Sequence, residues 1–201
     1  MSFYDERVLP VLVHSAMANR SLLEYRRRTV AAARGRILEV GIGSGINLPL
    51  YGGNVAAVFG IDPSASLLKR AHRQHASTKV DLIRGSAEAI PFPDKTFDAV
   101  MTTWTLCTIP DAAAALREMR RVLRPGGRLL FVEHGLAPDA AVMRWQRRLT
   151  PCWRCIAGGC HLDRKIDDLI AAAGFGIERL DTGYLFGKNP FAFMYEGIAR
   201  P

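Results

Sequence analysis

A glycine-rich turn directly after an apolar strand is the feature that most constrains the fold of this chain. The turn reads Gly41-Ile42-Gly43-Ser44-Gly45 and follows the segment Leu38-Glu39-Val40. A second apolar segment, Phe59-Gly60-Ile61, ends at Asp62. Glycines let a backbone turn sharply and approach a ligand, and an acidic residue at the end of the next strand accepts hydrogen bonds from both hydroxyls of a ribose. Together these features predict a site for a cofactor that contains a nucleoside.

The spacing of the glycines indicates which cofactor fits. Dinucleotide-binding turns read G-x-G-x-x-G and aim a helix N-terminus at a pyrophosphate. This turn reads G-x-G-x-G and holds no lysine for a phosphate. An adenosine ligand with a charged amino-acid tail fits better, and Glu39 is placed to orient its ammonium group. A plain glycine-rich connection between a strand and a helix is the alternative interpretation.

Two further blocks extend the pattern. Residues 85–98 read GSAEAIPFPDKTFD, and residues 123–127 read LRPGG. With the glycine turn, these blocks resemble the class I S-adenosylmethionine-dependent methyltransferases over most of residues 35–200. The resemblance implies an α/β, Rossmann-like fold with S-adenosylmethionine as the cofactor.

The same resemblance implies roles for individual residues. In the family, the three glycines line the methionine part of the cofactor, Asp62 holds the ribose, and the turn at Ser86 and Ala87 meets the adenine edge. Relatives commonly carry an aspartate where this chain has Ser86, so its hydroxyl is expected to be a weaker acceptor for the adenine amino group. The expected cofactor-binding residues are Glu39, Gly41, Gly43, Gly45, Asn47, Asp62, Pro63, Ser86, Ala87, Glu88, Thr103 and Trp104.

Length and composition predict a single domain. The chain has 201 residues, of which 49% are hydrophobic, so it can bury one substantial core but not two. No apolar run reaches the roughly 18 residues that span a bilayer, and the first residues lack the order of a signal peptide. A cytoplasmic protein is expected, with an N-terminal helical lid over residues 1–34 and the methyltransferase domain over residues 35–201.

The chain is strongly basic, with 27 basic and 19 acidic residues and a net charge of +8. Arginines gather at residues 26–28 and at Arg144, Arg147, Arg148 and Arg154. A basic face meets nucleic acid, an anionic membrane surface or an acidic substrate, and the alternative is a solvated helix face. The clusters lack the interleaved aromatic residues of a single-strand binder, so no nucleic acid is expected and peripheral contact with an anionic membrane stays open.

Apolar runs and turn residues predict the order of the elements. A helix is expected over residues 4–33, with Pro10 near its start or at a kink. The alternation of strands with helices that follows predicts a parallel sheet covered by helices. The last two strands, 176–181 and 191–199, have too short a connection for a helical crossover and should be antiparallel, which completes a seven-stranded, mostly parallel sheet. The earlier strands are expected at 36–40, 56–61, 80–83, 97–102 and 128–133, and the helices at 47–51, 64–76, 111–123 and 164–173.

The methyl acceptor is expected beyond the ends of the fourth and fifth strands, at residues 102–110 and 133–135. An insertion at about residues 135–163 should roof the acceptor pocket together with the lid. In-line methyl transfer depends mainly on positioning, and a general base is least needed for a thiol. His134 is the candidate catalytic residue, with Glu133 beside it. The alternative for His134 is a structural role at the strand end.

The cysteines suggest a metal site that we do not expect. Cys152-x-x-Cys155 is followed by Cys160 and His161, but four residues between the pairs are too few for the usual zinc pattern. No thioredoxin-like context supports a redox pair at Cys152 and Cys155. Nucleic-acid bases are not expected as acceptors either. The D/N-P-P-Y/F signature of amino-methylating enzymes is absent after the fourth strand. Pro151-Cys152 resembles the nucleophile of cytosine-carbon methyltransferases, but that nucleophile follows the fourth strand and this dipeptide follows the fifth.

Three blocks of the second half carry a closer resemblance. Residues 105–109 (TLCTI), 132–134 (VEH) and 159–164 (GCHLDR) resemble the methyltransferase-like thiol S-methyltransferases. The animal members carry a long hydrophobic N-terminal anchor, whereas an amphipathic helix is expected in that region of this sequence. The resemblance implies methylation of a small lipophilic thiol. It points to Cys107, His134, Cys160, His161 and Arg164 as acceptor-side residues.

Two alternatives stay open for the function. Residues 87–92 (AEAIPF) resemble phosphatidylethanolamine-type and ubiquinone/menaquinone methyltransferases, so the acceptor could be a lipid amine or a quinone. A protein that binds the cofactor without catalysis is the non-enzyme alternative. Labelled methyl transfer to a panel of acceptors separates these interpretations.

Overall fold

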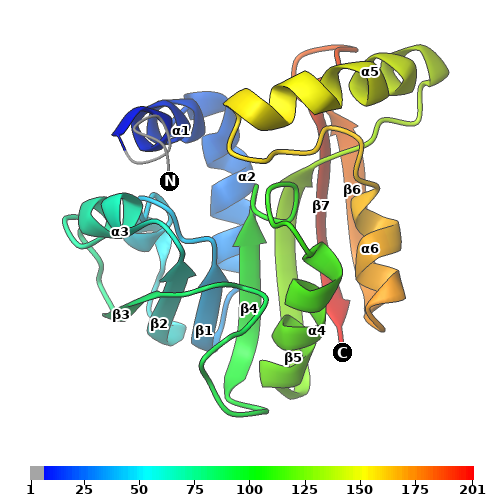
Figure 1. The fold of residues 1–201 in the computed structure, drawn as a ribbon. Coiled ribbons are helices and arrows are strands. Elements are labelled where there is room, and N and C mark those ends of the chain that lie inside the picture. Colours follow the sequence, from blue (N-terminus) through cyan, green and yellow to red (C-terminus); the bar gives the residue numbers. More distant parts are fainter. Residues whose placement is uncertain (1–6) are drawn as a thin grey trace.

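A seven-stranded sheet forms the centre of the protein, whose computed structural model describes residues 7–201 (Figure 1). The spatial order of the strands is β3-β2-β1-β4-β5-β7-β6. Strands β1 to β5 pair in parallel, and β7 pairs antiparallel with both β5 and β6, as the sequence predicts. The strands are β1 (Gly35–Val40), β2 (Val55–Asp62), β3 (Lys79–Arg84), β4 (Phe97–Thr103), β5 (Leu123–His134), β6 (Gly176–Tyr184) and β7 (Phe193–Arg200).

The strand order reverses between β1 and β4, because the chain runs outward from β1 to β3 and then crosses back to β4. Ligands of open α/β sheets bind at such a switch point, beyond the carboxyl ends of the strands. Figure 1 shows α1 and α5 above that edge of the sheet. The helices are α1 (Leu9–Met17), α2 (Arg20–Ala31), α3 (Ala65–Ala71), α4 (Ala112–Val122), α5 (Ala140–Ile156) and α6 (Ile166–Ala172), with a 3₁₀ turn η2 (Leu48–Leu50).

Alternate side chains of the central strands enter two separate cores. On β1, Leu38 packs in one core with residues of α4 and α6, whereas Ile37 packs in the other with residues of α2 and α3. On β4, Val100 packs in the same core as Leu38, and Met101 packs in the same core as Ile37. This period of two is what a strand buried on both faces requires.

The N-terminal helix predicted over residues 4–33 is wrong as one element. The structure has two helices there, and residues 4–6 of the prediction lie outside the described part of the chain. The break is at Asn19, whose backbone is extended. The Asn19 side chain caps α2, because its Oδ1 accepts a hydrogen bond from the Ser21 N–H over 3.0 Å. The apolar pattern continues across the break, which is why it reads as one helix.

Two other boundaries differ from the sequence prediction by five residues, more than the remaining boundaries do. Strand β5 begins at Leu123 and not at residue 128, because Leu123 already pairs with Phe97 before the register shifts. Helix α3 ends at Ala71, where the prediction ran to residue 76, because the last turn closes with 3₁₀-type bonds at Arg73 and Gln74.

Candidate functional site

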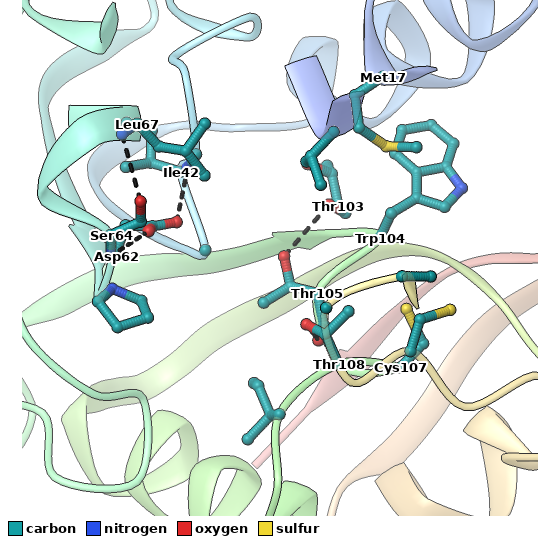
Figure 2. Close-up of a pocket in the computed structure, with 18 of the residues that line it drawn as sticks. Met17, Ile42, Asp62, Ser64, Leu67, Thr103, Trp104, Thr105, Cys107 and Thr108 are labelled. Atoms are coloured by element: carbon teal, nitrogen blue, oxygen red, sulfur yellow. Dashed lines mark hydrogen bonds between the residues drawn. The ribbon is translucent and has the colours of Figure 1, made fainter. Parts of the chain in front are cut away.

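A cavity of about 840 Å³ lies at the carboxyl ends of β1, β2, β4 and β5. Its walls are mainly apolar, and Figure 2 shows a close-up with Asp62 on one side and Trp104 and Cys107 on the other. Side chains of α1, among them Leu12, Val13 and Met17, cover it from above, and Trp153 of α5 closes it from the roof.

The glycines of the turn after β1 have different structural roles. Gly43 has φ +55°, and a Cβ built there would meet only the Gly41 carbonyl at 3.9 Å, so its free side faces open space in the cavity wall. A Cβ on Gly41 would instead lie 2.3 Å from Thr105 Cγ2. Gly43 thus leaves room for a ligand, while Gly41 lets the turn pack against the loop after β4.

Asp62 closes β2 beside this turn. Its Oδ2 accepts a hydrogen bond from the Gly43 N–H over 2.9 Å, and its Oδ1 accepts one from the Ser64 N–H over 2.8 Å. Burial raises the pKa of the Asp62 carboxyl, against the opposing effect of these two backbone donors. Each oxygen accepts one backbone hydrogen bond and keeps capacity for another, and Asp62 lines the cavity, which suits ribose hydroxyls.

Glu39 lies behind the cavity and not on its surface. Its two oxygens accept hydrogen bonds from Asn47 Nδ2 and from the Tyr51 hydroxyl, both over 2.7 Å. Burial raises the pKa of Glu39 to about 7, although the bonds from Tyr51 and Asn47 favour the charged form. Glu39 therefore fixes Asn47 below the glycine turn.

Arg26 of α2 is a cavity residue that the sequence prediction missed. Its Nη1 donates to Asn47 Oδ1 over 2.8 Å, and its guanidinium lies 4.7 Å from the centre of the Trp104 ring. Its Nε has no hydrogen-bond partner within residues 7–201. Burial lowers the pKa of Arg26 to about 10, despite the nearby charge of Glu39. Arg26 lies four residues from each of the apolar residues Leu22 and Val30, on the buried face of α2, and this helical spacing was the available signal.

These features fit S-adenosylmethionine. A buried arginine with an unpartnered donor suits a carboxylate, Gly43 leaves open space, and a buried acidic side chain stands where a ribose is expected. At the adenine edge, the Ser86 hydroxyl donates to Glu88 Oε2 over 2.8 Å. Glu88 is held in turn through Oε1, which accepts from the Asp111 N–H over 2.8 Å.

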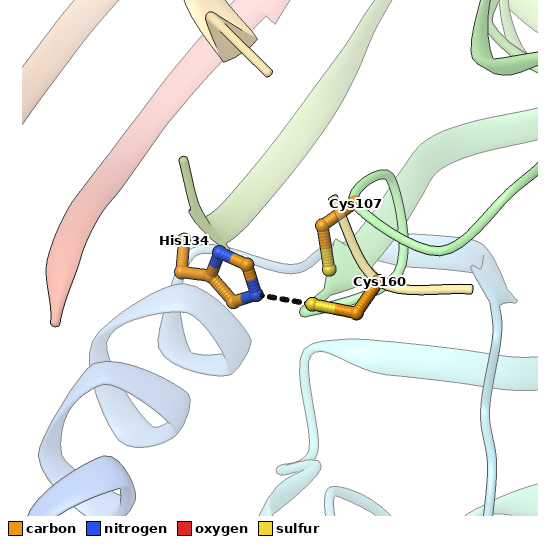
Figure 3. A group of neighbouring side chains, drawn as sticks. All are labelled: Cys107, His134 and Cys160. Carbon is orange, nitrogen blue, oxygen red and sulfur yellow. Dashed lines mark hydrogen bonds between the residues drawn. The ribbon is translucent and has the colours of Figure 1, made fainter. Parts of the chain in front are cut away.

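Cys107, His134 and Cys160 meet at the opposite end of the cavity (Figure 3). They come from the loop after β4, the end of β5 and the segment after α5. His134 Nε2 lies 2.8 Å from Cys160 Sγ, and the Trp153 indole N–H donates to the same sulfur over 3.2 Å. Glu133 points elsewhere, accepting the Thr105 N–H over 3.1 Å.

The charge in this cluster favours a thiolate on Cys160. The hydrogen bond from the Cys107 thiol, together with those from His134 and Trp153, lowers the pKa of Cys160, although burial opposes the shift. The same thiol–thiol bond and burial raise the pKa of Cys107. Burial alone would lower the pKa of His134, but the bond to Cys160 outweighs it and the pKa is raised.

The three donor atoms lie within 4.8 Å of one another, so this cluster is also the place to consider a metal. Two ligands of a tetrahedral zinc, one nitrogen and one sulfur, stand about 3.5 Å apart given the usual bond lengths. The separation of 2.8 Å between His134 and Cys160 is a hydrogen-bond distance instead. Cys152 and Cys155 are exposed on α5 and are not in the cluster.

His161 and Arg164 hold the roof in place and do not line the cavity. The His161 N–H donates to the Cys107 carbonyl over 2.8 Å. The Arg164 guanidinium donates to the carbonyls of Leu106 and Ile109, the latter over 2.7 Å. Of the residues expected from the sequence, those that line the cavity are Gly41, Gly43, Asp62, Pro63, Ser86, Ala87, Glu88, Thr103, Trp104, Cys107, His134 and Cys160; Glu39, Gly45, Asn47, His161 and Arg164 lie outside its lining.

Comparison with known proteins agrees with this geometry. Residues 38–131 match the family model of a methyltransferase domain, over the glycine turn and the first five strands. The chain belongs to the S-adenosylmethionine-dependent methyltransferases. An S-adenosylmethionine-dependent methyltransferase structure from Mesorhizobium loti has the same fold, with a TM-score of 0.70 and 18% identity, covering 92% of this chain and 100% of the other.

Two curated relatives of this methyltransferase are named for different methyl acceptors. A phosphatidylethanolamine N-methyltransferase of Cereibacter sphaeroides is 40% identical over 116 residues, covering 54% of this chain and 57% of the relative. The thiol S-methyltransferase TMT1B of Rattus norvegicus is 33% identical over 153 residues, covering 72% of this chain and 62% of the relative. The chain thus spans about 60% of the length of either relative. Within residues 7–201, no helix combines the length and the apolar character needed to cross a membrane.

Proposed function

We propose that this methyltransferase transfers a methyl group from S-adenosylmethionine to a small lipophilic thiol. The cofactor supplies an electrophilic methyl group on a sulfonium. Asp62, Gly43 and Arg26 would hold it at the glycine-turn end of the cavity, and the acceptor would lie toward Cys107, His134 and Cys160. The mainly apolar walls support a lipophilic acceptor and exclude water from it.

The observation that carries the choice of a thiol is the hydrogen bond between His134 and Cys160. An imidazole engaged in this way is a poor general base for a hydroxyl, whose proton must be removed in the reaction. A thiol has a pKa near 8.5 and supplies part of its own thiolate at neutral pH. We assign His134 as the catalytic residue, whose protonated ring would favour the thiolate form of the acceptor.

A second acceptor class has a specific observation in its favour. Helix α5 carries Arg144, Arg147 and Arg148 and exposes 55% of Trp145. A basic helix with an exposed aromatic residue suits contact with an anionic membrane, and the bacterial relative is named for a phospholipid substrate. A phospholipid amine is therefore the alternative acceptor.

The test is transfer of a labelled methyl group to a matched panel. The panel holds an alkyl thiol, the corresponding alcohol, a quinol and vesicles that contain phosphatidylethanolamine. We expect label in the thiol and much less in the alcohol. Label in the phospholipid alone would replace the thiol proposal with the alternative. Cofactor binding without label in any acceptor would favour a protein that binds without catalysis.

A further inference from the structure

Two cysteines that are distant in the sequence lie together in the acceptor end of the cavity. Cys107 follows β4 and Cys160 follows α5, and the bond from the His161 N–H to the Cys107 carbonyl holds their two segments side by side over 2.8 Å. Their sulfur atoms lie within 4.8 Å of each other (Figure 3), and both residues line the same cavity. A disulfide requires the two sulfurs to approach to about 2.05 Å, and the peptide map described below tests whether these two reach it.

The surroundings of the two sulfurs are unequal. Cys160 Sγ receives His134 Nε2 at 2.8 Å and the Trp153 N–H at 3.2 Å, two donors that stabilise a thiolate. Cys107 is buried to 1% exposure and has no such pair of donors among the described residues. One sulfur is set to react with an oxidant, and the other is set to follow as the thiol that completes a disulfide.

We propose that Cys160 and Cys107 form a peroxide-sensitive dithiol that closes as a disulfide and blocks the acceptor end of the cavity. In the first step, the Cys160 thiolate attacks one oxygen of hydrogen peroxide, the O–O bond breaks, and Cys160 becomes a sulfenic acid. The other oxygen leaves as hydroxide, which becomes water by taking up the proton that the Cys160 thiol released. In the second step, the Cys107 sulfur attacks the Cys160 sulfur and the sulfenic oxygen leaves as water with the Cys107 proton. Two thiols are oxidised by two electrons, and the peroxide is reduced to two molecules of water.

Closure of the disulfide would change the acceptor end directly. Cys160 Sγ must turn toward Cys107, so it leaves the imidazole of His134 and moves within the cavity wall. An acceptor positioned against this wall would lose its alignment for in-line transfer. This effect on turnover rests on the proposed function, whereas formation of the disulfide does not.

The chemical test uses the full chain with Cys152→Ser and Cys155→Ser, which removes the two exposed cysteines. After treatment with hydrogen peroxide, we expect the loss of two thiols per chain and a Cys107–Cys160 cross-link in peptide mapping by mass spectrometry. With Cys107→Ser added, a sulfenic acid should accumulate on Cys160 and be trapped by dimedone. Retention of both thiols, or trapping only at other residues, overturns the proposal.

A matched pair of tryptophan variants tests the origin of the reactivity. Trp153→Phe removes one donor to Cys160 Sγ but keeps a ring against Phe191, and it should slow peroxide oxidation of Cys160 severalfold. Trp145→Phe, on the exposed side of the same helix, should leave the rate unchanged. Equal rates in all three proteins would overturn the role of the indole donor.

The activity arm separates the two proposals. Methylation of an alkyl thiol should fall by roughly tenfold or more in the cross-linked protein and return after reduction with a phosphine. Full turnover in the cross-linked protein overturns the blocking step. A reduced protein that labels no thiol overturns the proposed function, and the cross-link then stands or falls on the peptide map alone.

Discussion

Arg26 of α2 donates a hydrogen bond to Asn47 Oδ1 over 2.8 Å, so the N-terminal helices are tied to the segment that follows the glycine turn. Asn47 is fixed on its other side by the buried carboxylate of Glu39. The Nε of Arg26 remains available within the described part of the chain. A buried guanidinium in this position suits an anionic group of the cofactor, so we expect the helices to form part of the cofactor site.

Replacing Arg26 should therefore weaken cofactor binding. Arg26→Ala is expected to lower the affinity for S-adenosylhomocysteine by about tenfold or more, because a charge-assisted hydrogen bond contributes about 1.5 to 3 kcal/mol. Isothermal titration calorimetry measures this. Arg27→Ala is the matched control, because the neighbouring side chain is exposed. Equal affinities of the two variants would remove Arg26 from the cofactor site.

Asp62→Ala should have an effect of similar direction. The variant loses the carboxylate expected to accept from both ribose hydroxyls, and affinity for S-adenosylhomocysteine should fall at least about tenfold. Asp81→Ala on the neighbouring strand β3 controls for a general change in charge, since Asp81 is partly exposed. Unchanged calorimetric affinity in Asp62→Ala would refute the assignment.

Gly43→Val should reduce cofactor binding further. The branched side chain would enter the open space beside the turn, and valine is strained at φ +55°. Gly52→Val is a suitable control, because a Cβ at Gly52 meets nothing within 4 Å. Thermal unfolding checks that the variant folds. If the Gly43→Val protein folds normally and binds normally, the glycine turn does not contact the cofactor.

The protein should contain no stoichiometric zinc. Cys152 and Cys155 are exposed on α5, and His134 and Cys160 stand at a hydrogen-bond distance of 2.8 Å. Elemental analysis of protein purified without chelator measures the metal content. A value near one zinc per chain would contradict this prediction, and chelation would then destabilise the fold if the zinc were structural.

His134→Ala should lower turnover of an alkyl thiol by about tenfold at neutral pH. The variant loses the ring that favours the acceptor thiolate, and this loss should shrink as the pH rises toward the thiol's own pKa of about 8.5. A hydroxyl acceptor would instead lose on the order of 10² to 10⁴. A pH–rate profile beside His75→Ala, an exposed histidine, checks this. A large loss that persists near pH 9 would contradict the thiol mechanism.

The succession of strands along the chain and the glycine turn after β1 were predictable because they depend on local sequence. Alternating apolar runs predict the sheet, and the turn at Gly43 with Asp62 carries its own conformational and chemical signal. The meeting of Cys107 with Cys160 was not predictable from spacing, because it depends on the path of the roof after α5. Arg26 was missed because the run Arg26-Arg27-Arg28 reads as a charged surface, and only the register of α2 turns one of the three inward.

The contact between Gly41 and Thr105 joins the two halves of the cavity. At Gly41 the turn on the cofactor side has no room for even one added carbon, since that carbon would lie 2.3 Å from Thr105 Cγ2. Thr105 lies in the loop after β4 that carries Cys107 on the acceptor side. We expect a shift of either wall to reach the other through this contact, so substitutions on one side should change the Michaelis constants of both the cofactor and the acceptor.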